Sequence, residues 1–164
     1  MSAYITLMTP MIDRECVLAA LADVGFGAAK VEVHDGPVEL VGYEGARRAQ
    51  AAEIVIRRQH IGPMSNDIGF VRTPTGFSAV ISDYDGGRYG ETWLRQLNAR
   101  YEDHLARKQE RLAEEERRRA EEERKRLVEA QRQAVHERAR KLGYRVEETR
   151  EGDRLRLVLV KRVY

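Results

Sequence analysis

The stretch EEERRRAEEERKR, Glu114 to Arg126, contains twelve charged residues and a single Ala. Nothing in it interrupts a helix, and the sequence from Glu91 to Leu142 contains neither Gly nor Pro. No apolar residue other than that Ala is available for a core over about four helical turns. The stretch therefore predicts a long helix, residues 91–142, whose middle has nothing to bury.

The charges are spaced so that acids precede bases by three or four residues. The expected pairs are Glu114 with Arg117 and Arg118, Glu115 with Arg118 and Arg119, and Glu122 with Lys125 and Arg126. Each such pair stabilises an isolated helix by about 0.2–0.5 kcal/mol. We therefore expect a solvated strut that is sensitive to salt.

Two other interpretations of this helix stay open. It could pair weakly with a second chain as a coiled coil, or bend into a helical hairpin. The coiled-coil interpretation rests on a seven-residue spacing of Ala113, Ala120, Leu127 and Ala134. The companion heptad position makes a poor seam, because it holds Glu116, Glu123 and Glu137.

The sequence on either side of the charged stretch predicts folded elements. Residues 1–90 contain a short helix that begins after Asp13, and strand patterns that pair locally, including a hairpin at Asp35-Gly36. Pro37, directly after this pair, favours an edge position or a wider loop. After Gly143, residues 143–164 alternate apolar and charged positions around a turn at Gly152, as in a β-hairpin. The predicted fold class is α+β: a mainly antiparallel sheet, one short helix, and one very long charged helix that ends in a β-hairpin.

Composition narrows the classes of function. The 29 basic and 27 acidic residues leave a formal charge of +2, so a strongly basic nucleic-acid surface is not expected. No segment is apolar enough for a membrane, and the single Cys16 excludes an internal disulfide. We expect a cytoplasmic protein that does not act on membranes.

The chain shows no pattern typical of a catalytic, cofactor or metal site. The four His residues lack a second ligand at metal spacing, and no Gly-rich phosphate loop is present. We therefore expect no enzymatic activity, no cofactor and no metal. Basic residues of the sheet region could contact an anion or a nucleic acid: Arg47, Arg48, Arg57, Arg58 and Arg88.

An ordered series of short motifs runs along almost the whole chain: MSAYITLMTPMIDRECVLAALADVGF, VGYEG, AEIVIR, DIGF, NARYEDHL, ARKLGYRVEE and GDRLRLVLVKR. In this series the chain resembles a family of small hypothetical proteins, a domain of unknown function, from algal plastids, cyanobacteria and their phages. The resemblance implies no catalytic residues, and an accessory role beside a MoxR-type AAA+ ATPase. Relative to shorter members, residues 110–133 look like an inserted charged helix.

Together these features predict a scaffold or adaptor that bridges or spaces partners. The partner would be another protein or a second copy of the chain, for example in an antiparallel swapped dimer in which each hairpin completes the other chain's sheet. The expected docking patch is apolar: Val146, Leu155, Leu157 and Leu159. The alternatives are a nucleic-acid-associated accessory protein and an enzyme of unrecognised type.

Overall fold

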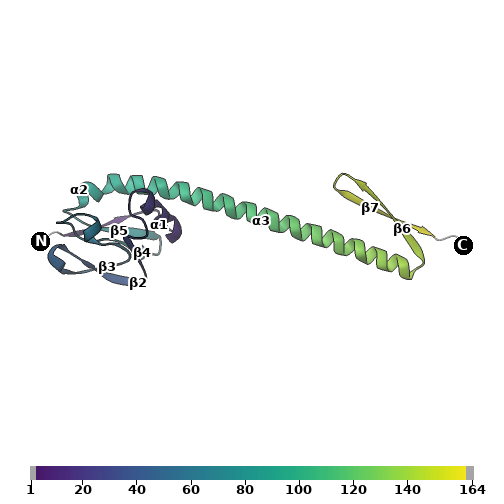
Figure 1. The fold of residues 1–164 in the computed structure, drawn as a ribbon, viewed down its shortest axis with the longest axis horizontal. Coiled ribbons are helices and arrows are strands. Elements are labelled where there is room, and N and C mark those ends of the chain that lie inside the picture. Colours follow the sequence, from purple (N-terminus) through teal and green to yellow (C-terminus); the bar gives the residue numbers. More distant parts are fainter. Residues whose placement is uncertain (1–2, 162–164) are drawn as a thin grey trace. The chain divides into compact units, whose positions relative to one another are not determined.

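The computed structural model describes residues 3–161, which fold into seven strands, three α-helices and two 3-10 turns (Figure 1). The chain forms two compact units, Met1–Gln109 and Glu110–Tyr164. The boundary between them lies inside the longest helix, α3, rather than at one of its ends. The last three residues of the predicted C-terminal hairpin lie outside the described part.

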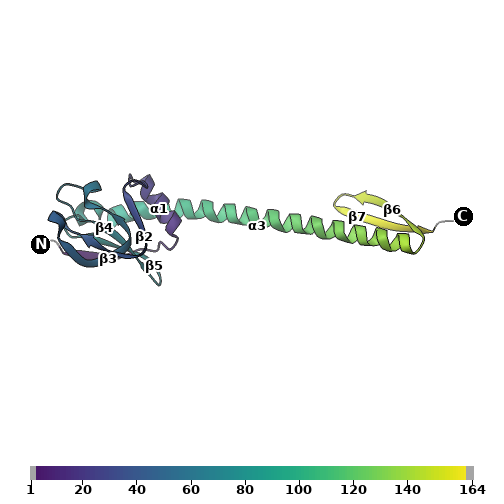
Figure 2. The same ribbon diagram turned by 60° about the horizontal axis from the view of Figure 1, so that its bottom comes forward.

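The first unit contains a five-stranded sheet of order β1-β5-β4-β3-β2, in which every neighbouring pair is antiparallel. This confirms the predicted α+β class. The strands are β1 (Tyr4–Met8), β2 (Val31–Val41), β3 (Arg47–Ile56), β4 (Ile68–Thr73) and β5 (Gly76–Ser82). Strands β1 and β2 form the two edges of this sheet. Figure 2 shows β2, β3, β4 and β5 from a second direction.

The short helix α1 (Arg14–Asp23) is built as the sequence predicts. Asp13 caps it, because its carboxylate accepts a hydrogen bond from the backbone N–H of Cys16 at 3.0 Å. The chain leaves the helix through Gly25, whose φ of +98° suits a residue without a side chain. The Asp13 carboxylate also forms an ion pair with the Lys108 ammonium group at 2.7 Å, and this contact links the start of α1 to α3 within the first unit.

The predicted hairpin at Asp35-Gly36 is wrong, because both residues lie inside the continuous strand β2. Between Val33 and Val38 the pairing of β2 with β3 shifts, so the Asp-Gly-Pro segment forms an irregularity rather than a turn. An edge strand tolerates this, because Pro37 need not donate to a neighbour on the open side. The chain instead reverses after β2 at Tyr43–Gly45, where the backbone adopts positive φ.

The core of the first unit lies on one face of the sheet, beneath α1 and the first turns of α3 (Glu91–Lys141). The largest fully buried side chains on this face come from the segment before α1, from the two helices and from the sheet: Met11 before α1, Val17 and Leu21 of α1, Leu97 of α3, and Ile54, Ile56, Ile68, Phe70, Phe77 and Ile81 of the sheet.

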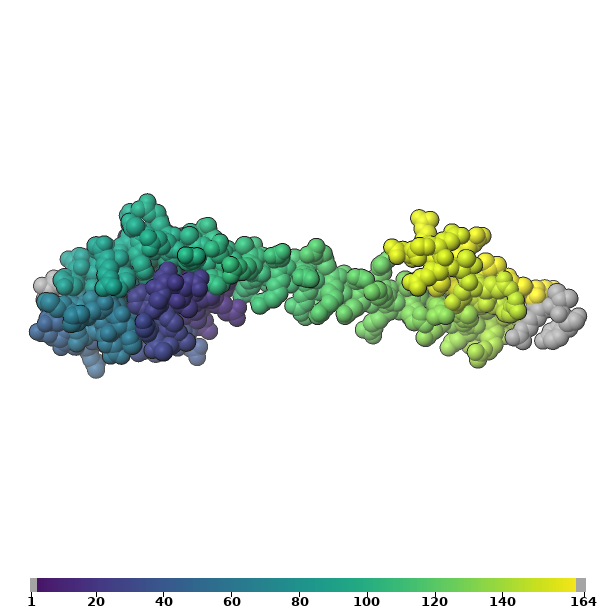
Figure 3. Space-filling view, turned by 45° about the horizontal axis from the view of Figure 1, so that its top comes forward, coloured from purple at the N-terminus to yellow at the C-terminus, as the bar shows by residue number. Residues whose placement is uncertain are grey.

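In the second unit, strands β6 (Tyr144–Glu151) and β7 (Arg154–Lys161) form a separate two-stranded sheet. Gly143, with φ of +76°, ends α3 and turns the chain into β6. The hairpin lies beside the end of α3, since Glu148 accepts hydrogen bonds from Arg132 at 2.7 Å and from His136 (Figure 3). The predicted C-terminal hairpin is therefore present.

Helix α3 spans 51 residues without interruption, beginning at the predicted Glu91. Of the predicted ion pairs, Glu115 with Arg119 is formed at 2.6 Å. Arg118 instead pairs forward with Glu122 at 3.9 Å, and Lys125 pairs with Glu121 at 2.7 Å. Each base has several acids within reach, so spacing alone could not decide which contact forms.

Tyr101 offers a test of how α3 and α1 are joined within the first unit. Its hydroxyl accepts hydrogen bonds from the backbone N–H groups of Ile12 and Asp13 at 3.0 and 3.1 Å, and its side chain is buried. Tyr101→Phe leaves both donors without this acceptor and should lower the free energy of unfolding by about 1–3 kcal/mol in chemical denaturation. Tyr144→Phe, at an exposed position, should change it by less than about 0.5 kcal/mol. Equal effects would contradict this account of Tyr101.

Candidate functional site

The most concentrated polar arrangement in the first unit is centred on Asp67, whose side chain is 1% exposed. One carboxylate oxygen accepts from the backbone N–H of Arg58, and the other accepts from the backbone N–H of Val41, both at 2.8 Å. The carbonyl oxygen of Asp67 accepts from the Tyr4 hydroxyl at 3.0 Å. Asp67 thus joins β1, β2 and the end of β3 just before β4 begins.

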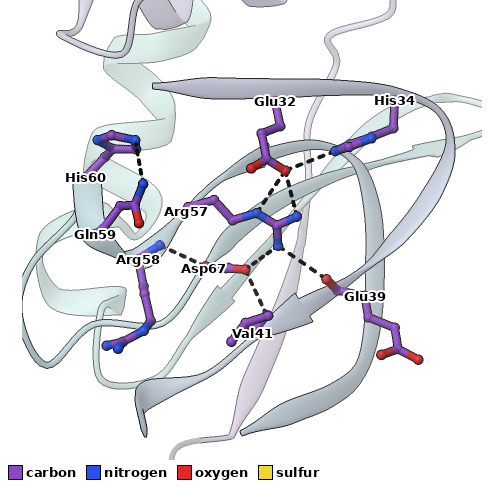
Figure 4. A network of polar contacts seen from close by, with 9 residues as sticks. All are labelled: Glu32, His34, Glu39, Val41, Arg57, Arg58, Gln59, His60 and Asp67. Carbon is purple, nitrogen blue, oxygen red and sulfur yellow. Dashed lines mark hydrogen bonds and ion pairs between the residues drawn. The ribbon is translucent and has the colours of Figure 1, made fainter. Parts of the chain in front are cut away.

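Arg57 connects this buried carboxylate to a second, more exposed one (Figure 4). Its guanidinium contacts Asp67 at 2.8 Å on one side and Glu32 at 2.6 Å on the other. Glu32 also contacts the His34 ring at 3.1 Å. The cation is therefore shared between two acids, as buried charges require if they are to remain ionised.

The ionisation of this network follows from these contacts. The hydrogen bond from Arg57, helped by His34, holds the pKa of Glu32 below its usual range. The hydrogen bond to Glu32 raises the pKa of Arg57 most, and the hydrogen bond to Asp67 raises it further. Burial and the nearby Asp67 carboxylate raise the pKa of Tyr4, which stays a neutral hydrogen-bond donor. These contacts favour the ionised forms of Glu32 and Arg57 and the neutral form of Tyr4.

An open depression of about 650 Å³ lies over this network. Three carboxylates and three guanidinium groups line it: Glu32, Glu39, Asp67, Arg47, Arg57 and Arg58. Val38, Val41 and Gln59 complete the lining. Its charges balance, so it offers donors and acceptors of both signs rather than a uniformly positive surface.

The structure brings together three of the five arginines predicted as an anion or nucleic-acid contact. Arg47, Arg57 and Arg58 line the depression, whereas Arg48 lies near the Tyr4 ring and Arg88 near the Tyr89 ring. Arg57 is already paired with two acids. The contact itself remains a prediction.

The predicted docking patch on the hairpin lies on one face of β6 and β7. Val146 is opposite Leu159 in the register, and Leu155 and Leu157 follow on the same side. Glu148 is on this side too and contacts α3, so the face is turned toward the helix end. Leu159 nevertheless remains 51% exposed, while the other three are half-buried.

A third feature is a groove of about 400 Å³ in the first unit between strand β1 and the start of α3. Leu7, Met8 and Leu94 supply much of its lining. Met8 is 80% exposed, and β1 pairs on one side only, with β5. An open edge of this kind presents backbone N–H and C=O groups to a further strand.

A comparison with known families matches residues 20–128 to the model described as "Protein of unknown function (DUF1257)". The match covers more than half of the chain. The chain belongs to this family. No curated protein and no solved structure matches it. The DUF1257 match includes residues 110–128, most of the segment expected to be inserted, and leaves out the hairpin.

Within the described residues, 3–161, this DUF1257 protein has no group of three or more His, Cys, Asp or Glu residues that could hold a metal ion. None of its helices over the same range combines the length and apolar character needed to cross a bilayer.

Sequence reasoning found Arg57 but missed its partners. Asp67 and Glu32 stand 10 and 25 positions from Arg57 in the chain, and their contact depends on how three strands assemble. One signal was available: Asp67 immediately precedes the apolar strand β4 within the DIGF motif, where an acid next to a buried segment needs a partner.

The Arg57 network should contribute strongly to the stability of this DUF1257 protein. Arg57→Met keeps the length of the side chain but leaves the buried Asp67 without its cation. We expect the free energy of unfolding to fall by about 3 kcal/mol in urea denaturation. Arg47→Met, at a position 86% exposed, is the matched control and should cost less than about 0.5 kcal/mol. A loss below about 1 kcal/mol for Arg57→Met would contradict a central role for this ion pair.

The lowered pKa of Glu32 predicts a specific acid sensitivity. A carboxylate with a depressed folded-state pKa stabilises the protein above its unfolded pKa, here near 4.5, and this stabilisation is lost as pH falls through the folded value. Glu32→Gln should therefore destabilise the protein at pH 6 and flatten the decline in stability below pH about 4.5. Thermal unfolding from pH 6 to 3, with Glu44→Gln as control, measures this. An unchanged acid slope in Glu32→Gln would rule out this contribution.

Proposed function

We propose that this DUF1257 protein is a non-enzymatic adaptor that uses α3 as a spacer between two binding surfaces. The observation that carries the proposal is the exposure of residues 109–131, which are all exposed except the half-buried Glu115. A helix exposed on every side contributes no core and is typical of an element that bridges in solvent. At 1.5 Å per residue this segment is about 34 Å long.

The two surfaces proposed for this role lie one on each unit. On the first unit, the groove beside β1 suits an extended peptide segment, because the strand edge can accept a further strand through backbone hydrogen bonds. On the second unit, the hairpin face around Leu159 suits an apolar anchor of a protein partner. The charge balance of the Arg57 depression favours a protein partner over a nucleic acid.

The proposed partner is a MoxR-type AAA+ ATPase, and the adaptor would be accessory to it. Support comes from the likeness to plastid, cyanobacterial and phage proteins noted in the sequence motifs, and the proposed location is cytoplasmic. The nucleic-acid-associated role and an unrecognised enzymatic role are weaker alternatives. In the first unit, the charged groups that converge are already paired with one another.

Binding assays with a purified MoxR-type ATPase from the same genome test the adaptor. Leu159→Arg places a charge on the proposed docking face and should weaken binding at least about tenfold. The matched control is Val158→Arg, because Val158 neighbours Leu159 in β7, is similarly exposed at 41%, and lies on the opposite face of the hairpin. The control should change binding by less than about threefold.

Three results would argue against the proposal. Wild-type protein could fail to bind the ATPase, both variants could bind as tightly as wild type, or the control could be as damaging as Leu159→Arg. A DNA-binding assay run in parallel addresses the alternative. Binding that weakens steeply between 50 and 200 mM salt would favour the nucleic-acid role instead.

A further inference from the structure

The second unit buries almost nothing within its own chain. Over its described residues, 110–161, Ala139 is the one residue that is buried. Large apolar side chains remain at least 41% exposed along the helix and the hairpin: Leu112, Leu127, Val128, Leu142, Val158 and Leu159. A two-stranded hairpin on a single helix is marginal without a further apolar layer. This unit therefore needs a surface from outside itself.

One face of α3 in this unit repeats every seven residues, and we name it the Leu127 face. It consists of Ala113, Ala120, Leu127 and Ala134, all of which are exposed. Small side chains at three of the four positions allow another helix to approach closely, and Leu127, 58% exposed, is the large apolar contact among them.

Opposite charges run along the two sides of the Leu127 face. Positions three residues after each face residue lie on one side of it and positions four residues after lie on the other. The first line is acidic and consists of Glu116, Glu123 and Glu137, interrupted by Ala130. The second line is basic and consists of Arg117, Arg124 and Arg138, interrupted by Gln131.

These flanking charges have no ion-pair partner among the described residues, whereas several charges elsewhere on the same turns do. Glu115, Glu121 and Glu122 each pair with a base of the helix. Glu116 and Glu123 do not, and Arg117 reaches only the backbone carbonyl of Ala113 at 3.4 Å. Glu114 and Arg126, elsewhere on the helix, also form no ion pair within the described residues. The charges beside the Leu127 face are available to a partner.

We propose that the Leu127 face binds a second copy of this chain in a parallel, in-register helix pair. In a parallel pair related by a two-fold axis along the helices, the acidic line of one copy meets the basic line of the other. Glu116 then lies beside the partner's Arg117 and Glu123 beside the partner's Arg124, on both sides of the seam. The Glu residues that weaken a conventional apolar seam become the partner-facing charges.

An antiparallel pair on the same face has the opposite electrostatics. Its two-fold axis is perpendicular to the helices, so acid would face acid along one side and base would face base along the other. An antiparallel swapped dimer would have to avoid the Leu127 face. The parallel pair is independent of the proposed adaptor role, because it can form whether or not an ATPase binds the hairpin.

Charge reversal followed by rescue tests the pairing. Wild-type protein at about 100 µM and low salt should have twice the 18.8 kDa mass of one chain by light scattering. Glu116→Arg with Glu123→Arg should raise the dimer dissociation constant at least about tenfold, and adding Arg117→Glu with Arg124→Glu should restore it. The control, Glu114→Arg, makes the same kind of charge change at a position that also forms no ion pair among the described residues and lies off the Leu127 face and its two flanking lines, so it should leave the dimer intact.

Cysteine crosslinking tests the orientation in a Cys16→Ser background. Ala113→Cys and Ala134→Cys should each form a disulfide with the same residue of a second copy, and Glu122→Cys should not. The proposal would be overturned if the protein stayed a monomer at all concentrations or if the charge-reversal rescue failed. It would also be overturned by a dimer in which neither Ala113→Cys nor Ala134→Cys forms a disulfide. If the protein is a monomer and still binds the ATPase, the adaptor role is supported and the parallel helix pair is ruled out.

Discussion

The structure depends on a helix that must hold its conformation without a core. Between Gln109 and Gln131 the backbone N–H and C=O groups of α3 bond within the helix, and its side chains face solvent. Ion pairs such as Glu115 with Arg119 and Glu121 with Lys125 add stability one turn at a time. Because no such pair is shielded, this stability is modest and falls with salt. Most of this segment belongs to the second unit, so the second unit is also only weakly stabilised within one chain. Its stability should therefore depend on association.

The first unit differs from this helix, because it buries a large apolar core together with charged groups. Ile54, Phe70 and Leu97 lie in that core with no exposure, while the buried Asp67 fixes three strands through backbone donors and the cation of Arg57. Such a network holds the ends of these strands in fixed positions. The proposed adaptor role uses this contrast between a well-packed first unit and a second unit with little core of its own.

Much of the fold could be predicted because its signals are local. Asp13 before α1, Gly143 after α3 and the alternation of Leu155 and Leu157 each act within a few residues. Two features could not be predicted in this way. The Asp35-Gly36 pair has the composition of a turn, but β2 continues through it because an edge strand can absorb an irregularity there. The site around Arg57 depends on Glu32 and Asp67, which only the assembled sheet brings together.

Hydrogen exchange at two protein concentrations tests the central claim most directly. If the second unit depends on a surface from another copy, amides of residues 110–161 should become better protected as concentration rises from about 1 to about 100 µM. Amides of the five-stranded sheet should be unaffected, since its core is complete within one chain. Equal protection of residues 110–161 at both concentrations would contradict the account, because it would show that the stability of the unit does not depend on association with a second copy.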